Sequence, residues 1–133
     1  MSENYKVEFK VRSYEVDIYG HVNNATYMNY LEQARNEFLA LKEMSYKQLM
    51  ARGVFFALVH TSINYRAESF VDEVLIVTGE IIHFGNTSIR LKHEIFNKEN
   101  GKLIVDAQAV IAFTDGKRPI PIPDFFKEAF EQD

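Results

Sequence analysis

Residues 14–35 contain the side chains of this sequence that could do chemistry. An acid, a glycine, a histidine and two asparagines stand close together: Asp17, Gly20, His21, Asn23 and Asn24. They come directly before a segment with helical periodicity, and the start of a helix offers unpaired N–H groups and about half a positive charge. A substrate carbonyl at that point would be polarised. One such donor typically stabilises the oxyanion formed on attack by about 2.7–4 kcal/mol.

Asp17 is close enough in sequence to face the same carbonyl. The positive helix end would keep its carboxylate ionised at neutral pH, so that it could attack the carbonyl or activate a water molecule. Each residue also has a structural explanation, because aspartate is common in turns, asparagine caps helices, and an isolated histidine is more often structural than catalytic. Spacing alone therefore gives a candidate site and leaves its chemistry open.

The elements that would position this stretch follow from the apolar periodicity. A helix is predicted over residues 25–42, because apolar side chains recur there at helical spacing: Tyr27, Leu31, Ala34, Phe38 and Leu41. It would be about 27 Å long. Residues 45–52 predict a second, short helix that ends before Gly53, and a last short helix is expected from Asp124.

Five strands are predicted, over residues 5–11, 57–65, 74–82, 89–95 and 103–113. Residues 74–82 are apolar on both faces, which is typical of a central strand, whereas the others have one apolar face. Asn100-Gly101 and residues 84–87 predict hairpin turns. A sheet that curls round the long helix buries both apolar surfaces most simply, so the sequence predicts one α+β domain over residues 1–133.

Composition excludes several classes of protein. The chain of 133 residues is 47% hydrophobic and has a net charge of −4, with no basic cluster, so we expect no nucleic-acid partner. It has no cysteine, which excludes disulfides and a cysteine nucleophile. Its histidines lack ligand-like spacing with acids, so neither metal nor cofactor is expected. No secretory signal and no membrane span are visible, and a cytoplasmic location is expected.

The motif beginning at Asp17 resembles the signature region of the 4-hydroxybenzoyl-CoA thioesterase family. It reads Asp17-x-x-Gly-His-Val-Asn-Asn-x-x-Tyr27, followed by Tyr30-Leu-Glu-x-Ala-Arg35. Weaker similarities follow at residues 63–65, 70–74, 85–88 and 100–101, so that the resemblance covers residues 5 to 125. It implies a hot-dog fold, a five-stranded antiparallel sheet wrapped round one long helix. It also implies a homodimer, often paired into a homotetramer. Because the exposed edges of a five-stranded sheet invite pairing, we expect the dimer to form edge to edge, with active sites at the seam between subunits.

The resemblance implies hydrolysis of a thioester of coenzyme A or of acyl carrier protein, and it assigns roles. Asp17 matches the catalytic carboxylate, and the backbone N–H of Asn24 matches the donor to the thioester oxygen. His21 and Asn23 match positions beside the substrate. The sequence after Gly20 is polar, whereas it is apolar and aromatic in the 4-hydroxybenzoyl enzyme, which favours a fatty or short acyl chain over a benzoyl group.

Further substrate contacts are expected outside the motif. Tyr27 and Phe56 are expected to line an acyl tunnel, with Tyr30, Leu31, Phe55 and Leu58 as further candidates and core packing as the alternative for all of them. Arg118 is expected to bind the phosphates of coenzyme A. Arg66, Arg90, Lys92 and Lys117 are further candidates, although alternating cations on a strand are more often simply solvent-exposed.

Two other functions are compatible with the fold. Hot-dog hydratases and dehydratases carry a signature that looks like Asp-x-Asn-Pro-x-His, whereas here His21 comes four positions after Asp17 and the Asn-Pro pair is absent. A non-catalytic acyl-CoA-binding module is the other alternative, and the intact Asp17 argues against it. Thioester hydrolysis is the function that the sequence favours.

Overall fold

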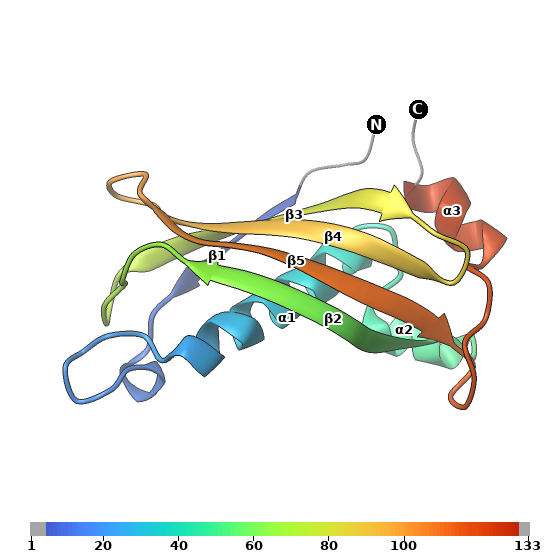
Figure 1. Cartoon of the computed structure of the whole chain (residues 1–133), viewed down its shortest axis with the longest axis horizontal. Coiled ribbons are helices and arrows are strands. Elements are labelled where there is room, and N and C mark those ends of the chain that lie inside the picture. The colour runs from blue at the N-terminus through green and yellow to red at the C-terminus, as the bar shows by residue number, and fades with distance from the viewer. Residues whose placement is uncertain (1–4, 131–133) are drawn as a thin grey trace.

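The computed structural model describes residues 5–130 and consists of one curved sheet and one long helix (Figure 1). The antiparallel sheet has the order β1-β3-β4-β5-β2, and α1 lies along one face of it. This confirms the predicted α+β, hot-dog architecture. The strands are β1 (Tyr5–Lys10), β2 (Phe55–Tyr65), β3 (Val74–Phe84), β4 (Ser88–Asn97) and β5 (Leu103–Thr114). The helices are α1 (Asn24–Ala40), α2 (Tyr46–Ala51) and α3 (Asp124–Phe130), with a short 3-10 turn at Ser13–Glu15.

The long helix α1 buries one stripe against the sheet, as its periodicity predicts. Tyr30, Leu31 and Phe38 are each 2% exposed or less. The helix ends at Ala40, two residues earlier than expected, because the backbone tightens: the N–H of Leu41 donates to Phe38, and that of Lys42 donates to Leu39. The predicted short helix is confirmed as α2, whose Ser45 side chain accepts from the N–H of Gln48.

Two groups of buried side chains hold the helix to the sheet. One lies at the start of α1 and includes Tyr27, Leu31 and Val77. The other lies at its end, where Phe38 packs with Phe126 of α3 and with other side chains of α2, β4 and β5. Full burial of one such side chain contributes about 1.5–3 kcal/mol. The helix is thus fixed at both ends, which sets the position of its N-terminus.

The edge strand β2 differs from its predicted pattern of one apolar and one polar face. It pairs only with β5, and the four central residues 57–60 are exposed on both faces. Leu58 is 47% exposed and Val59 is 62% exposed. The free edge therefore presents unpaired backbone groups together with apolar side chains, a combination that invites pairing with another strand.

The predicted turns are confirmed. Gly101 follows Asn100 in the β4–β5 hairpin with φ +71°, a conformation that glycine adopts readily, and Gly85 lies in the β3–β4 turn. Over residues 5–130, none of the helices has the length and apolar character needed to cross a membrane.

Candidate active site

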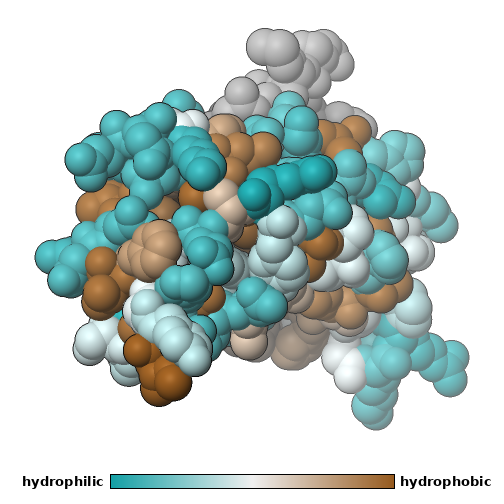
Figure 2. All heavy atoms as spheres, turned by 60° about the vertical axis from the view of Figure 1, so that its left-hand side comes forward, coloured by the Kyte–Doolittle hydropathy of each residue, from teal (hydrophilic) through white to brown (hydrophobic). Residues whose placement is uncertain are grey.

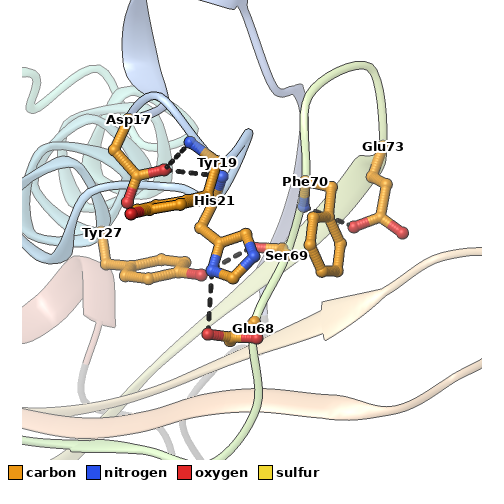
Figure 3. Close-up of polar contacts among 8 residues, drawn as sticks. All are labelled: Asp17, Tyr19, His21, Tyr27, Glu68, Ser69, Phe70 and Glu73. Carbon is orange, nitrogen blue, oxygen red and sulfur yellow. Dashed lines mark hydrogen bonds and ion pairs between the residues drawn. The ribbon is translucent and has the colours of Figure 1, made fainter.

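Asp17 stands in a tight loop that its own carboxylate stabilises (Figure 3). One oxygen, Oδ1, accepts the N–H of Tyr19 at 2.9 Å and that of His21 at 3.2 Å. The N–H of Gly20 donates to the Asp17 carbonyl, and Gly20 has φ +82°, which favours glycine at this position. The second oxygen, Oδ2, has no hydrogen-bond partner among residues 5–130, and the side chain is exposed. Asp17 therefore has the structural role that its residue type suggests and still presents a free carboxylate oxygen.

His21 is held by the loop between β2 and β3. Its Nδ1 lies 2.9 Å from Oε1 of Glu68, and its ring meets the Phe70 ring edge-on with centroids 4.7 Å apart. His21 and Phe70 also form a backbone bridge, so two segments far apart in sequence lie side by side here (Figure 3). With Nδ1 engaged by Glu68, Nε2 is the ring nitrogen left for contact with a ligand.

The start of α1 carries an open backbone donor. Asn23, one of the two asparagines able to cap the helix, occupies the N-cap position, but its side chain makes no capping hydrogen bond. Its own N–H donates to the carbonyl of Glu15. The N–H of Asn24 has no acceptor within the described part of the chain, so it is available to a ligand oxygen.

Buried tyrosines fix the helix start against the surrounding loops. The Tyr27 hydroxyl lies 2.6 Å from Oγ of Ser69, and the Tyr30 hydroxyl donates to Glu15 at 2.8 Å. Burial, together with the bond to Glu15, raises the pKa of Tyr30, which keeps this hydroxyl a donor. Burial alone would raise the pKa of Glu15, but hydrogen bonds from Arg12 and Tyr30 outweigh it and lower that pKa. Glu15 thus stays ionised and anchors the side chains of Arg12 and Tyr30.

These groups surround one cavity of about 400 Å³ at the end of the sheet where β2 finishes. The structure brings together there four of the predicted site residues, Asp17, His21, Asn24 and Tyr27. Figure 2, which turns this end of the molecule forward, shows a mosaic of hydrophilic and hydrophobic side chains. Arg66, one of the cations considered for phosphate binding, also lines the cavity and forms a 2.6 Å ion pair with Asp106.

Three predicted substrate contacts lie elsewhere in this chain. Asn23 is exposed but does not line the cavity. Phe56 lies at the beginning of β2, whereas Tyr65, which lines the cavity, lies at its end. The separation of nine residues between these positions corresponds to about 30 Å along an extended strand. Arg118 stands in the turn after β5, next to the beginning of β2 through the bridge of Thr114 with Pro119. Tyr30 and Leu31 are core residues, 2% exposed each.

Two functional candidates were not predicted from the sequence. Glu68 could not be predicted, because no sequence pattern links an acid in a connecting loop to a histidine 47 positions earlier. Arg35 did give a signal: it lies four positions after Leu31, on the apolar stripe of α1, where a charged residue is unusual. Residues 5–130 contain no cluster of histidine, aspartate and glutamate side chains able to hold a metal ion.

The chain is similar in sequence to known thioesterases. The sequence profile of the thioesterase-like superfamily matches residues 11–130. The chain belongs to this superfamily. It is 30% identical over 129 residues to the long-chain acyl-CoA thioesterase FadM of Escherichia coli, covering 96% of this chain and 97% of FadM. It is 31% identical over 131 residues to the acyl-acyl carrier protein thioesterase ATL3 of Arabidopsis thaliana, covering 98% of this chain and 69% of ATL3.

A solved thioesterase structure confirms the fold. The crystal structure of a 4-hydroxybenzoyl-CoA thioesterase variant bound to 4-hydroxybenzoyl-CoA superposes with a TM-score of 0.88, over 96% of this chain and 98% of that chain. The two sequences are 17% identical, so this likeness concerns the fold alone. The resemblance predicted from the motif at Asp17 is confirmed, and so is the expected enzyme class, because the named relatives are thioester hydrolases.

Proposed function

We propose that this chain hydrolyses acyl thioesters of coenzyme A or of acyl carrier protein, with Asp17 as nucleophile or general base. The observation that carries the proposal is the meeting, in one cavity, of a free carboxylate oxygen, an open helix N–H and a histidine: Asp17, Asn24 and His21. The activities of FadM and ATL3 support the substrate class.

In this proposal the thioester oxygen binds at the N–H of Asn24, where the helix end polarises the carbonyl. Oδ2 of Asp17 either attacks the carbonyl carbon or takes a proton from a water molecule that attacks it. The negative charge that develops on the oxygen is stabilised by Asn24. Collapse of this intermediate breaks the C–S bond. The departing thiolate takes up the proton that Asp17 removed from water or, on the nucleophilic route, a proton from solvent. An acyl-Asp17 intermediate, if formed, is released by water.

Glu68 and His21 have supporting roles. Glu68 fixes the ring of His21 through Nδ1 and so directs Nε2 toward the cavity. In this proposal Nε2 of His21 contacts the bound thioester, without forming or breaking the bond itself. Glu68 is a positioning residue, since it acts through His21.

We propose further that the active form is a dimer built through β2. Antiparallel pairing of two β2 strands about a two-fold axis would cover Leu58 and Val59 and extend the sheet. It would also place the beginning of one β2 beside the end of the other. The partner subunit's Phe56 and the partner subunit's Arg118 would thereby reach the cavity of Asp17, as expected for acyl and phosphate contacts.

A screen of acyl-CoA and acyl-carrier-protein thioesters of increasing chain length, with detection of the released thiol, tests the proposal. We expect turnover that depends on acyl length. Binding of acyl-CoA without thiol release on any chain length would instead identify a binding module. Hydration of an unsaturated acyl-CoA without thiol release would identify a hydratase.

A further inference from the structure

A second cavity, of about 310 Å³, lies at the end of the molecule opposite Asp17 and contains a buried arginine. Residues of α1, α2, β2 and β5 line it, and its walls are largely apolar, with Leu49, Val54, Phe56 and Ile111 among them. Its size falls in the range of small-molecule sites. Among the polar residues of this lining, the buried Arg35 calls for an explanation.

Arg35 is 4% exposed and has no carboxylate partner in the described part of the chain. Its hydrogen-bonding neighbours are neutral groups: Nη1 lies 3.5 Å from Nε2 of His93, and a hydrogen bond also links Arg35 to Tyr46. Its Nε is the only buried side-chain polar atom of residues 5–130 without a partner. A guanidinium offers five N–H donors and is costly to bury unpaired, and residues 5–130 leave its Nε without an acceptor.

His93 cannot balance the charge of Arg35. Its Nδ1 lies 2.9 Å from the carbonyl of Thr78, which can only accept, so Nδ1 carries the proton. Burial lowers the pKa of His93 to about 4, and the ring is therefore neutral at physiological pH. Its Nε2 lone pair can accept one bond from Arg35, which orients the guanidinium without neutralising it.

Two other polar residues line the same cavity. Burial raises the pKa of Tyr46, although the charge of Arg35 and a hydrogen bond with it act in the opposite direction, so Tyr46 keeps its hydroxyl proton. Glu32 is exposed and forms no ion pair with Arg35 within residues 5–130. The cavity thus combines apolar walls with two hydrogen-bond donors, and Nε of Arg35 has no acceptor within residues 5–130.

We propose that Arg35 and Tyr46 bind an oxygen atom at the far end of the acyl chain, which makes oxygenated acyl thioesters the preferred substrate class. The inference rests on the proposed function for the identity of the chain. In the proposed dimer, the Phe56 end of one β2 lies beside the Asp17 cavity of the partner. An acyl chain whose thioester binds in that cavity would therefore run along these apolar walls toward Arg35.

Binding of coenzyme A thioethers, which cannot be hydrolysed, tests this directly. The ligands are S-alkyl-CoA chains of several lengths, each with a terminal methyl, hydroxyl or carboxyl group, and Kd is measured by calorimetry. At one chain length we expect an oxygenated end to bind about tenfold more tightly than the methyl end, as a hydrogen bond to a charged group allows. Tighter binding of the hydroxyl end would show that the preferred ligand group is neutral, and tighter binding of the carboxyl end that it is anionic.

Arg35→Met keeps the length of the side chain and removes its donors, so we expect it to abolish the preference. Arg52→Met is the matched control: Arg52 is exposed, stacks on Phe125 outside the cavity, and should keep the preference. Equal preference in the wild type and Arg35→Met, or no preference in the wild type at any chain length, overturns the inference. Because the thioethers are not cleaved, a failure of the proposed hydrolysis would not affect this readout.

Discussion

His93 should make the protein sensitive to mild acid. The side chain is fully buried, and burial lowers its pKa from about 6.5 to about 4. The unfolded chain therefore binds a proton that the folded chain excludes, and it does so between these two pH values. The free energy of unfolding should not depend on His93 above pH ~6.5, should fall as the pH drops toward ~4, and should be level below that.

The size of the loss follows from the two pKa values. A difference of about 2.5 pH units corresponds at most to about 3 kcal/mol, and about 2 kcal/mol of it is lost by pH ~5. A loss of this size is a large share of the stability of a small domain, which is about 5–15 kcal/mol.

Denaturant unfolding at about pH 7 and pH 5, at one protein concentration, measures this loss. His93→Gln removes the titrating ring, so its stability should fall by about 2 kcal/mol less than that of the wild type between these two pH values. His83→Gln is the control, because His83 is exposed on β3 and should leave the pH dependence unchanged. If His93→Gln and the wild type lose the same stability on acidification, burial does not keep His93 neutral in the folded protein.

Three further outcomes are expected. Glu68→Gln should lower kcat about fivefold, because an exposed ion pair to His21 contributes at most about 1 kcal/mol. Glu99→Gln in the β4–β5 turn is the control and should not change kcat. If the two variants have equal kcat, Glu68 does not contribute to the mechanism. Phe56→Trp should shift activity toward shorter acyl chains, and lower stability with an unchanged chain-length ratio would make Phe56 a core residue. Light scattering at micromolar concentration should give at least a dimer mass, and Val59→Glu at the β2 edge should reduce it to a monomer mass; a monomeric wild type would contradict the pairing.

The fold could be predicted closely from the sequence, because its signals are local. The period of α1, the alternation along β4 and the Asn100-Gly101 turn each depend on a few neighbouring residues. β2 was predicted less well, since exposure at an edge depends on which strand lies next to it. The end of α1 was misplaced by two residues for a similar reason: the tightened turn after Ala40 leaves no mark in the apolar pattern.

The candidate site could be predicted only in part. Asp17, His21 and Asn24 lie close together because seven residues of one loop and one helix start hold them. Glu68 reaches His21 through a tertiary bridge, and no local pattern encodes that contact. The separation of Phe56 from Tyr27 likewise follows from the length of β2, and the proposed second subunit is what would bring such residues together.

Asp17→Asn is the substitution best suited to the central claim. The amide oxygen of asparagine can still accept the N–H groups of Tyr19 and His21, so the loop should remain intact. Only the negative charge and the free Oδ2 are lost. Circular dichroism and thermal unfolding should therefore match the wild type, which separates an effect on catalysis from an effect on folding.

The decisive measurement is kcat of Asp17→Asn and of His21→Ala on the best thioester found in the screen. We expect kcat of Asp17→Asn to fall by about 10²–10⁴-fold, the usual contribution of a nucleophile or general base, with little change in KM because Asn24 still holds the carbonyl. His21→Ala should lower kcat less than Asp17→Asn does. If Asp17→Asn keeps more than half of the wild-type kcat, Asp17 only stabilises its loop, and the proposed mechanism is wrong.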